Sequence, residues 1–202
     1  MNSAPDPADI STSARQEPRL PPGQVLTDKW PVLHYGSVPK VDLARWDFRV
    51  HGLVERPQTW SWQEFQALPR VQVRSDVHCV TRWSRFDNLW EGVAVRDALQ
   101  RALVKPEARF AVVHAEGGYT TNLPLTELIE DDVLLADKHD GHDLAPEHGW
   151  PLRLVVPRRY FWKSAKWVRA IELVAEDRPG FWEQNGYHNQ ADPWKEERFS
   201  DW

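Results

Sequence analysis

The chain of 202 residues contains a single cysteine, Cys79, and this thiol has the narrowest set of possible chemistries in the sequence. One sulfur cannot form an internal disulfide, a four-cysteine iron–sulfur or zinc site, or a two-cysteine haem attachment. Three roles remain: an inert buried thiol, a nucleophile paired with a histidine, or a thiolate ligand to a soft metal whose other donors come from elsewhere. Apolar residues alternate from Val71 to Cys79, which predicts a strand that buries the thiol and turns His78 to the opposite face.

A second candidate site is the stretch from His148 to Ile171, which carries six basic residues and no acid. Aromatic residues interleave with these cations between residues 160 and 167. Such a stretch is either a solvated cationic face or a site for a flat heterocycle that bears a phosphate, because these cations bind phosphate and stack on aromatic rings. The basic residues are Arg153, Arg158, Arg159, Lys163, Lys166 and Arg169.

A third group of polar residues lies between positions 139 and 148 and includes three histidines, His139, His142 and His148. Imidazole and carboxylate donors could bind Zn or Mn, but this spacing matches no strong zinc signature, and Gly141 indicates a turn. We therefore expect a polar surface loop, with a metal-dependent hydrolase as the alternative. The glycine-rich nucleotide loops and the G-x-S-x-G nucleophile elbow are absent from the sequence.

The elements that must position these residues are mostly strands, with short helices at irregular intervals. Apolar alternation or short apolar runs predict strands over 46–50, 71–79, 110–115, 133–136, 152–156 and 168–174. Apolar spacing and capping residues predict helices over 61–68, 95–103 and 124–129. This order favours an α+β fold with mixed sheets over a doubly wound parallel sheet.

Composition excludes several classes of function. A net charge of -5 argues against a nucleic-acid or anionic-membrane surface, and no apolar run is long enough to span a bilayer. Five prolines among polar residues predict a disordered tail over 1–24, followed by one domain over 25–202. The aromatic residues after Pro179 are expected to hold an extended C-terminal tail onto that domain. No export signal precedes the domain, so a cytoplasmic location is expected.

Several motifs, taken together and in order, resemble those of the sulfite-oxidase-type molybdopterin oxidoreductases, and most of all their small single-domain branch. The resemblance extends over roughly residues 20–200. Its motifs are H-C-V-T-R-W-S at 78–84, W-E-G-V at 90–93, G-Y-T-T-N-L-P-L at 118–125, P-L-R-L-V-V-P at 151–157, Y-F-W-K-S-A-K-W at 160–167 and the tail at 177–194.

The resemblance implies a pyranopterin dithiolene that holds molybdenum, with Cys79 as the protein's thiolate ligand. It further implies oxygen-atom transfer at a Mo-oxo centre, with electrons passing through a separate protein partner. By motif position, Tyr119 resembles a tyrosine near the metal. The residues that the resemblance implies as cofactor contacts are His34, Tyr35, Cys79, His148, Arg153, Lys163, Ser164 and Lys166.

Two departures from the family pattern concern the substrate, which we expect to be a small oxide or oxyanion. Arg82 stands where the small branch usually has glycine, so we predict that its guanidinium orients the substrate. Leu33 stands where sulfite oxidases carry an arginine, so sulfite oxidation is not expected. The alternative function is a non-catalytic carrier of the molybdenum cofactor that retains the fold.

Overall fold

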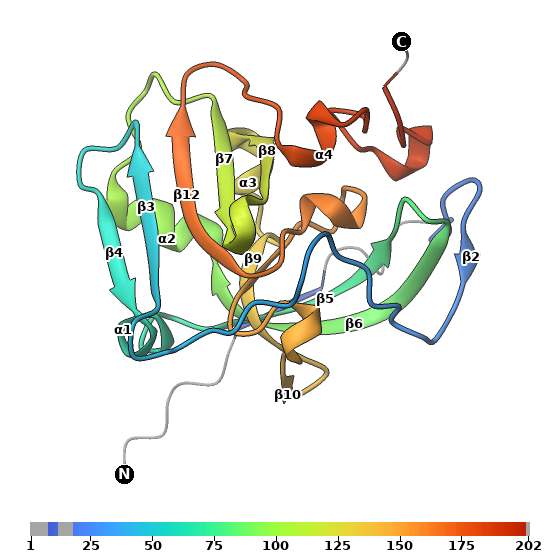
Figure 1. Cartoon of the computed structure of the whole chain (residues 1–202), viewed down its shortest axis with the longest axis horizontal. Coiled ribbons are helices and arrows are strands. Elements are labelled where there is room, and N and C mark those ends of the chain that lie inside the picture. The colour runs from blue at the N-terminus through green and yellow to red at the C-terminus, as the bar shows by residue number, and fades with distance from the viewer. Residues whose placement is uncertain (1–7, 12–17, 201–202) are drawn as a thin grey trace.

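Two β-sheets form most of the protein, and the computed structural model describes residues 8–11 and 18–200 (Figure 1). The first sheet has seven strands in the order β1-β5-β6-β9-β10, with β11 paired to β9 and β2 paired to β6. The second has five strands in the order β4-β3-β12-β7-β8. Both sheets mix parallel and antiparallel pairs, so the α+β prediction is confirmed.

The bounds of the elements are as follows. The first sheet contains β1 (Ala8–Ser11), β2 (Val25–Leu26), β5 (Val71–His78), β6 (Trp83–Ala94), β9 (Leu134–His139), β10 (His142–Asp143) and β11 (Arg153–Val155). The second contains β3 (Asp47–Gly52), β4 (Gln58–Ser61), β7 (Phe110–Ala115), β8 (Thr120–Pro124) and β12 (Val168–Val174). The helices are α1 (Trp62–Gln66), α2 (Val95–Ala102), α3 (Leu125–Leu128) and α4 (Phe181–Gln184), with 3-10 turns η2 (Glu116–Gly118), η3 (Pro146–His148), η4 (Phe161–Lys163) and η5 (Pro193–Lys195).

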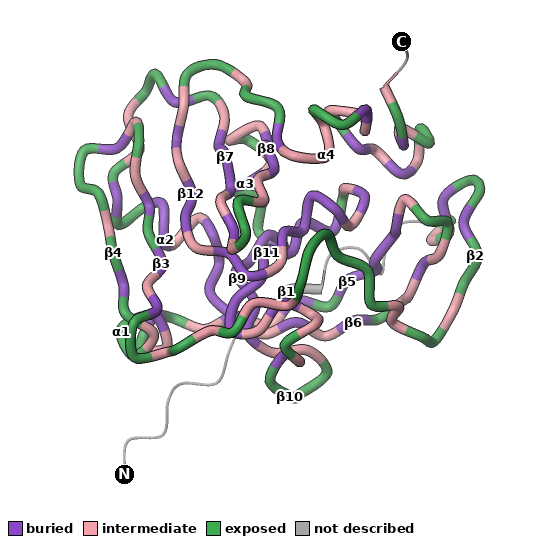
Figure 2. The backbone as a smooth tube through the Cα atoms, viewed as in Figure 1, coloured by how far each residue is buried: buried purple, intermediate pink, exposed green. Residues whose placement is uncertain are grey.

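The two longest predicted helices form for the reasons that the sequence indicates. Ser61 caps α1 in a capping box with Glu64, whose carboxylate accepts a hydrogen bond of 2.8 Å from the Ser61 backbone N–H. Helix α2 buries the face that carries Val95, Ala98, Leu99 and Ala102. These helices and the inner faces of the strands close one large apolar core between the two sheets (Figure 2).

The strand that leads to the cysteine is more irregular than strict alternation predicts. The β5–β6 register shifts between Ser75 and Val77, so four consecutive residues at the end of β5 are buried. His78 still faces away from the thiol, because its Nδ1 lies 2.8 Å from the hydroxyl oxygen of Ser84. Cys79 begins the turn that connects β5 to β6.

The described part of the N-terminal segment, for which the sequence predicts disorder over 1–24, lies against the domain. Residues 8–11 pair in parallel with β5. Arg19 donates two hydrogen bonds to Asp76, of 2.9 and 2.7 Å, and Gln24 is buried. The ion pair between Arg19 and Asp76 and the buried amide of Gln24 hold this segment, whose sequence has few apolar residues. The rest of the predicted tail, 1–7 and 12–17, lies outside the described residues.

The described helices include none with the length and apolar character needed to cross a bilayer. The aromatic C-terminal segment packs against the domain beside β8, as Figure 1 shows for α4.

Candidate functional site

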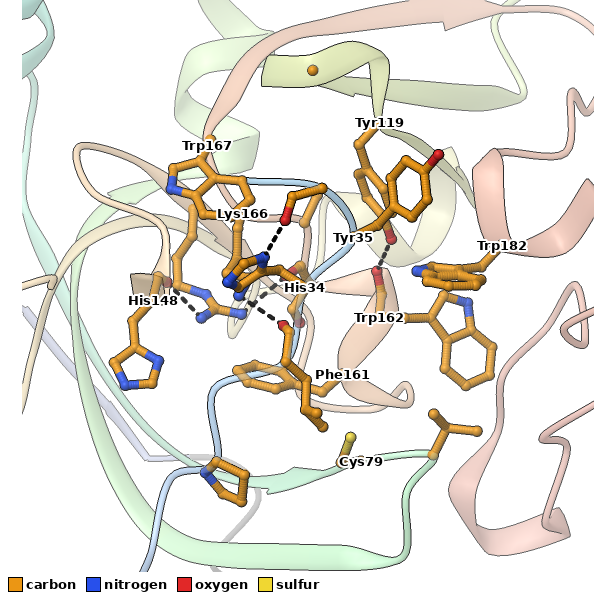
Figure 3. Close-up of a pocket in the computed structure, with 18 of the residues that line it drawn as sticks. His34, Tyr35, Cys79, Tyr119, His148, Phe161, Trp162, Lys166, Trp167 and Trp182 are labelled. Atoms are coloured by element: carbon orange, nitrogen blue, oxygen red, sulfur yellow. Dashed lines mark hydrogen bonds between the residues drawn. The ribbon is translucent and has the colours of Figure 1, made fainter. Parts of the chain in front are cut away.

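A cavity of about 520 Å³ opens between the turn after β5, the extended segment 30–39 and the loops that flank η3 and η4 (Figure 3). Segments distant in the sequence therefore share one site. Eight of the residues that the sequence predicts for the site line this cavity: His34, Tyr35, Cys79, Tyr119, His148, Arg153, Ser164 and Lys166.

Cys79 lies at the wall of the cavity in a tight turn. Its backbone N–H donates to the Trp83 carbonyl at 2.9 Å, and its carbonyl accepts from the Arg82 N–H at 3.0 Å. The Thr81 hydroxyl donates to the Cys79 sulfur at 3.1 Å. Burial raises the pKa of the thiol, while the Thr81 hydrogen bond and the charge of Arg198 partly offset that rise. A metal ion bound to the sulfur would favour the thiolate far more strongly.

Arg153 is a buried guanidinium with no carboxylate partner among the described residues. It donates to the carbonyls of His148, at 2.8 Å, and Ser164, at 3.0 Å, and its Nε has no hydrogen-bond partner. The Phe161 ring lies 4.2 Å from the guanidinium carbon. Burial lowers the pKa of Arg153 to about 9. A buried cation of this kind requires an anion for compensation, and the cavity is where an anion can reach it.

Lys166 adds a second cation to the same wall. Its ammonium donates to the carbonyls of Leu33 and Glu147, both at 2.8 Å. Burial and the neighbouring Arg153 charge lower its pKa to about 7. The absence of a side chain at Gly149 lets Arg153 and Lys166 pack close to the backbone there, since a Cβ at Gly149 would lie 3.1 Å from Arg153 Cβ and 3.2 Å from Lys166 Cβ. The two cations therefore lie on one wall of the cavity, an arrangement that suits an anionic ligand.

His148 and Ser164 complete this cationic side of the cavity. The His148 ring stacks on Trp30 with centroids 3.7 Å apart and planes at 13°. Burial, together with the charges of Arg153 and Lys166, lowers the pKa of His148 to about 4, so the imidazole is neutral at pH 7. Ser164 accepts the Val156 N–H at 2.9 Å, which leaves its hydroxyl hydrogen available as a donor.

Aromatic rings form the other side of the cavity, where Tyr35, Trp162 and Trp182 lie above Cys79 and toward the right in Figure 3. Trp182 stacks on Tyr187 with centroids 4.8 Å apart. Tyr119 donates its phenol hydrogen to the Trp162 carbonyl at 2.7 Å, and burial raises its pKa well above the usual value. The site thus has an anion-binding side and an uncharged aromatic side, with the thiol between them.

Arg82, which is predicted to orient the substrate, does not line the cavity. It takes a left-handed backbone conformation with φ of 70° at the end of the turn. This backbone directs the exposed side chain toward Gly23, where a Cβ would lie 3.0 Å from Arg82 Nη1. The position of Arg82 three residues after Cys79 does not predict the direction of its side chain.

Lys163, which is predicted as a cofactor contact, does not line the cavity either. Its ammonium is buried and lies 2.7 Å from a carboxylate oxygen of Glu183, which is equally buried. It also donates to the Asn122 carbonyl at 2.9 Å. As part of 3-10 turn η4, Lys163 points to the C-terminal segment, whereas Lys166 points to the cavity.

Seven aromatic residues that line the cavity have no individual role predicted from the sequence, namely Trp30, Trp83, Phe161, Trp162, Trp167, Trp182 and Tyr187. The signals in the sequence were the high tryptophan content and the aromatic residues interleaved with cations over 160–167, and neither separates core residues from cavity walls. The histidines at 139 and 142 form no metal site: among the described residues, no group of three or more His, Cys, Asp or Glu could hold a metal ion.

The fold and the site define a class of protein: a mixed two-sheet domain whose cavity is lined by one cysteine, two cationic side chains and several aromatic rings. Residues 35–182 match the family described as the oxidoreductase molybdopterin binding domain, and the chain belongs to this family. The predicted family resemblance is therefore confirmed, and the chain is an oxidoreductase of the sulfite oxidase type.

The chain is 50% identical over 186 residues to the uncharacterized oxidoreductase YuiH of Bacillus subtilis, covering 92% of this chain and 94% of that protein. It is 27% identical over 170 residues to a putative protein-methionine-sulfoxide reductase subunit of Azospira oryzae, covering 83% of this chain and 64% of that one. It is 26% identical over 190 residues to sulfite oxidase of Arabidopsis thaliana, where the shares are 76% and 48%. Against the latter two, it spans less than two thirds of the relative's length.

A solved structure supports the fold independently. The sulfane dehydrogenase SoxCD of Paracoccus pantotrophus superposes with a TM-score of 0.67 at 22% identity, covering 76% of this chain and 43% of that chain. At that identity the likeness concerns the arrangement of the sheets and does not extend to the reaction.

Proposed function

We propose that this protein binds a molybdenum pyranopterin and transfers an oxygen atom to or from a small oxide, with Cys79 as the protein's ligand to the metal. One observation carries the proposal: the only thiol of the chain and a buried, uncompensated guanidinium, Arg153, face the same cavity. A thiolate suits a soft metal, and the cation suits the phosphate of the same cofactor.

The residues present fit such a cofactor. Arg153 and Lys166 would hold its phosphate, with the hydroxyl of Ser164 as a further donor. Neutral His148, stacked on Trp30, would contact the pterin without adding a third positive charge. His34 and Tyr35 lie on the extended segment that borders the cavity, and would close over the ring system from that side.

A bound molybdenum pyranopterin supplies two-electron redox chemistry, and the protein's own groups decide what reaches it. The aromatic side of the cavity excludes water around the thiol. Tyr119 would orient a substrate oxygen only after its hydroxyl exchanges the Trp162 carbonyl for that oxygen, because it has a single hydrogen to donate. Its raised pKa keeps it protonated, so it acts as a donor and not as a base.

Uncharged substrates fit this site better than oxyanions. Arg82 is outside the cavity, and the lysine and arginine that line it are those assigned to the phosphate. Leu33, which lines the cavity, adds an apolar side chain where sulfite oxidases have a cation. A neutral sulfoxide or N-oxide is therefore the proposed substrate class, in keeping with the name of the Azospira relative. Electrons would come from a separate protein, since one cysteine cannot hold an iron–sulfur cluster or a c-type haem.

The test is to express the chain with molybdate, measure molybdenum and pterin per chain, and assay dye-linked reduction of sulfoxides and N-oxides alongside oxidation of sulfite. We expect about one molybdenum per chain and turnover of a neutral oxide. Zinc without molybdenum would contradict cofactor binding. Molybdenum without any turnover would indicate the carrier alternative, and turnover of sulfite alone would contradict the substrate class.

A further inference from the structure

Both terminal segments of the chain donate hydrogen bonds to the turn that carries Cys79. Its four residues, 79–82, form a turn closed by the hydrogen bond from the Arg82 N–H to the Cys79 carbonyl, at 3.0 Å. The carbonyl of Cys79 also accepts 3.0 Å from the side-chain amide of Gln24, which is buried. The next carbonyl, that of Val80, accepts 2.7 Å from Nη1 of Arg198, 118 residues away.

Arg198 connects three parts of the molecule at this point. Its guanidinium is 5% exposed and lies over the Tyr160 ring, 4.9 Å from the centroid. Its Nη2 approaches the carbonyls of Pro22 and Gly23 at 3.4 and 3.5 Å. The Cys79 turn, the N-terminal segment and the ring of Tyr160 therefore share one cation.

The burial of Arg198 is costly and weakly compensated by acids. The Glu196 carboxylate lies 3.6 Å from Nη2 and is 45% exposed, and the Arg198 Nε has no hydrogen-bond partner among the described residues. Among the described residues, the guanidinium makes its shortest hydrogen bond to the Val80 carbonyl. A neutral side chain would fill this space without the desolvation cost, so a purely packing role explains the cation poorly.

We infer that Arg198 is a positioning residue for Cys79: through the Val80 carbonyl, and together with Gln24 on the Cys79 carbonyl, it fixes the turn that presents the sulfur to the cavity. This inference rests on the proposed function for the role of the sulfur as a metal ligand. The hydrogen bonds of Arg198 and Gln24 to this turn, which we call the clamp, join protein groups only. Gly23, where the two terminal segments meet, has a φ of 66°, a left-handed conformation that favours glycine.

The test is residue-resolved amide hydrogen exchange on the full chain, purified from cells grown with and without molybdate. The amides of Cys79 and Arg82 report opening of the turn, because the Arg82 N–H donates to the Cys79 carbonyl and the Cys79 N–H donates across the turn to the Trp83 carbonyl. The amide of Ile171, in the centre of β12, reports global unfolding. The variants are Arg198→Met, Arg198→Lys and Gln24→Leu, with Arg159→Met as a control that removes a half-buried arginine paired with Glu127.

We expect Arg198→Met to accelerate exchange at Cys79 and Arg82 about ten- to hundredfold relative to Ile171, as the loss of a charged hydrogen bond predicts. Arg198→Lys should restore most of the protection, and Arg159→Met should leave the ratio unchanged. In molybdenum-loaded protein, the Mo(V) electron paramagnetic resonance signal should shift in Arg198→Met and return toward wild type in Arg198→Lys.

An unchanged ratio in Arg198→Met, or an equal change in Arg159→Met, would overturn the inference. If Arg198→Met does not fold, Gln24→Leu decides by the same ratio. Absence of molybdenum would count against the proposed function, while altered exchange in the molybdenum-free chain would still support the clamp. Altered exchange with an unchanged electron paramagnetic resonance signal would overturn the role of Arg198 toward the metal ligand.

Discussion

Arg153 and Cys79 are both buried. A buried guanidinium is stabilised by an anion, and a buried thiolate is stabilised by a metal ion. The guanidinium has two carbonyl acceptors and no carboxylate among the described residues, and the thiol has a hydroxyl donor and a distant cation. Each group separately has a structural explanation, either a tolerated buried arginine or an inert thiol. Their shared cavity favours one ligand that supplies an anion to the first and a metal to the second.

Replacement of Arg153 by methionine should remove most of the bound cofactor. A charged hydrogen bond to phosphate contributes roughly 1.5–3 kcal/mol, so affinity should fall about ten- to hundredfold. The measurement is pterin content after dialysis. Arg158→Met is the control, because Arg158 pairs with Asp132 and does not line the cavity. Equal pterin content in both variants would remove Arg153 from the anion site.

Anion binding at this site should weaken as pH rises through about 7, the pKa of Lys166. Deprotonation removes one of two positive charges, while neutral His148 does not titrate in this range. Sulfate is a suitable probe because its own charge stays constant there. Calorimetric titration of the cofactor-free chain between about pH 6 and about pH 8.5 measures the effect. The slope should vanish in Lys166→Met, and persistence of the same slope would contradict the assignment.

Arg82→Ala should leave both cofactor content and the KM for a neutral oxide unchanged within about twofold, because an exposed side chain outside the cavity contributes little. The measurement is steady-state kinetics on loaded enzyme, paired with molybdenum content. A KM that rises severalfold for anionic substrates alone would return Arg82 to the substrate site.

At the scale of elements, the short helix α4 depends on a buried ion pair for its place beside the cavity. Glu183 Oε1 accepts from Lys163 Nζ at 2.7 Å, from Trp162 Nε1 at 2.9 Å and from Thr121 at 3.1 Å. An isolated helix of four residues is unstable, so these hydrogen bonds fix α4 against β8 and η4. They thereby place Trp182, the residue before Glu183 in α4, in the aromatic wall of the cavity.

Breaking this ion pair from one side should be costly. Lys163→Met or Glu183→Gln leaves a buried group without its partner, and we expect each to lower the free energy of unfolding by about 3–5 kcal/mol. The double variant should lose clearly less than the sum of the two. Urea denaturation of the four proteins measures the coupling, and additive losses would show that the pair does not act as a unit.

At the scale of the whole molecule, local patterns in the sequence predicted what local physics decides. The capping residue Ser61 and the buried face of α2 formed as expected, and the apolar strand before Cys79 formed with a register shift that alternation does not predict. The family motifs, which encode the cavity as a whole, brought eight predicted residues to one place.

Long-range contacts account for what the sequence did not predict. Arg82 turns away because its left-handed conformation depends on the whole turn, and Lys163 faces Glu183, which lies 20 residues further along the chain. The N-terminal segment was expected to be disordered up to residue 24, yet Arg19 and Gln24 find buried polar partners that no sequence window contains. No local pattern in the sequence predicts the direction of a side chain or its partners in distant segments of the fold.

The central claim is that Cys79 is the protein's ligand to molybdenum in this cavity. X-ray absorption at the molybdenum edge, on wild type and Cys79→Ser expressed with molybdate, tests it most directly. Serine oxygen is a harder donor of similar size, so the fold should persist while one Mo–S scatterer is lost or the metal is absent. The same number of Mo–S scatterers at the same occupancy in both proteins would show that Cys79 does not bind the metal.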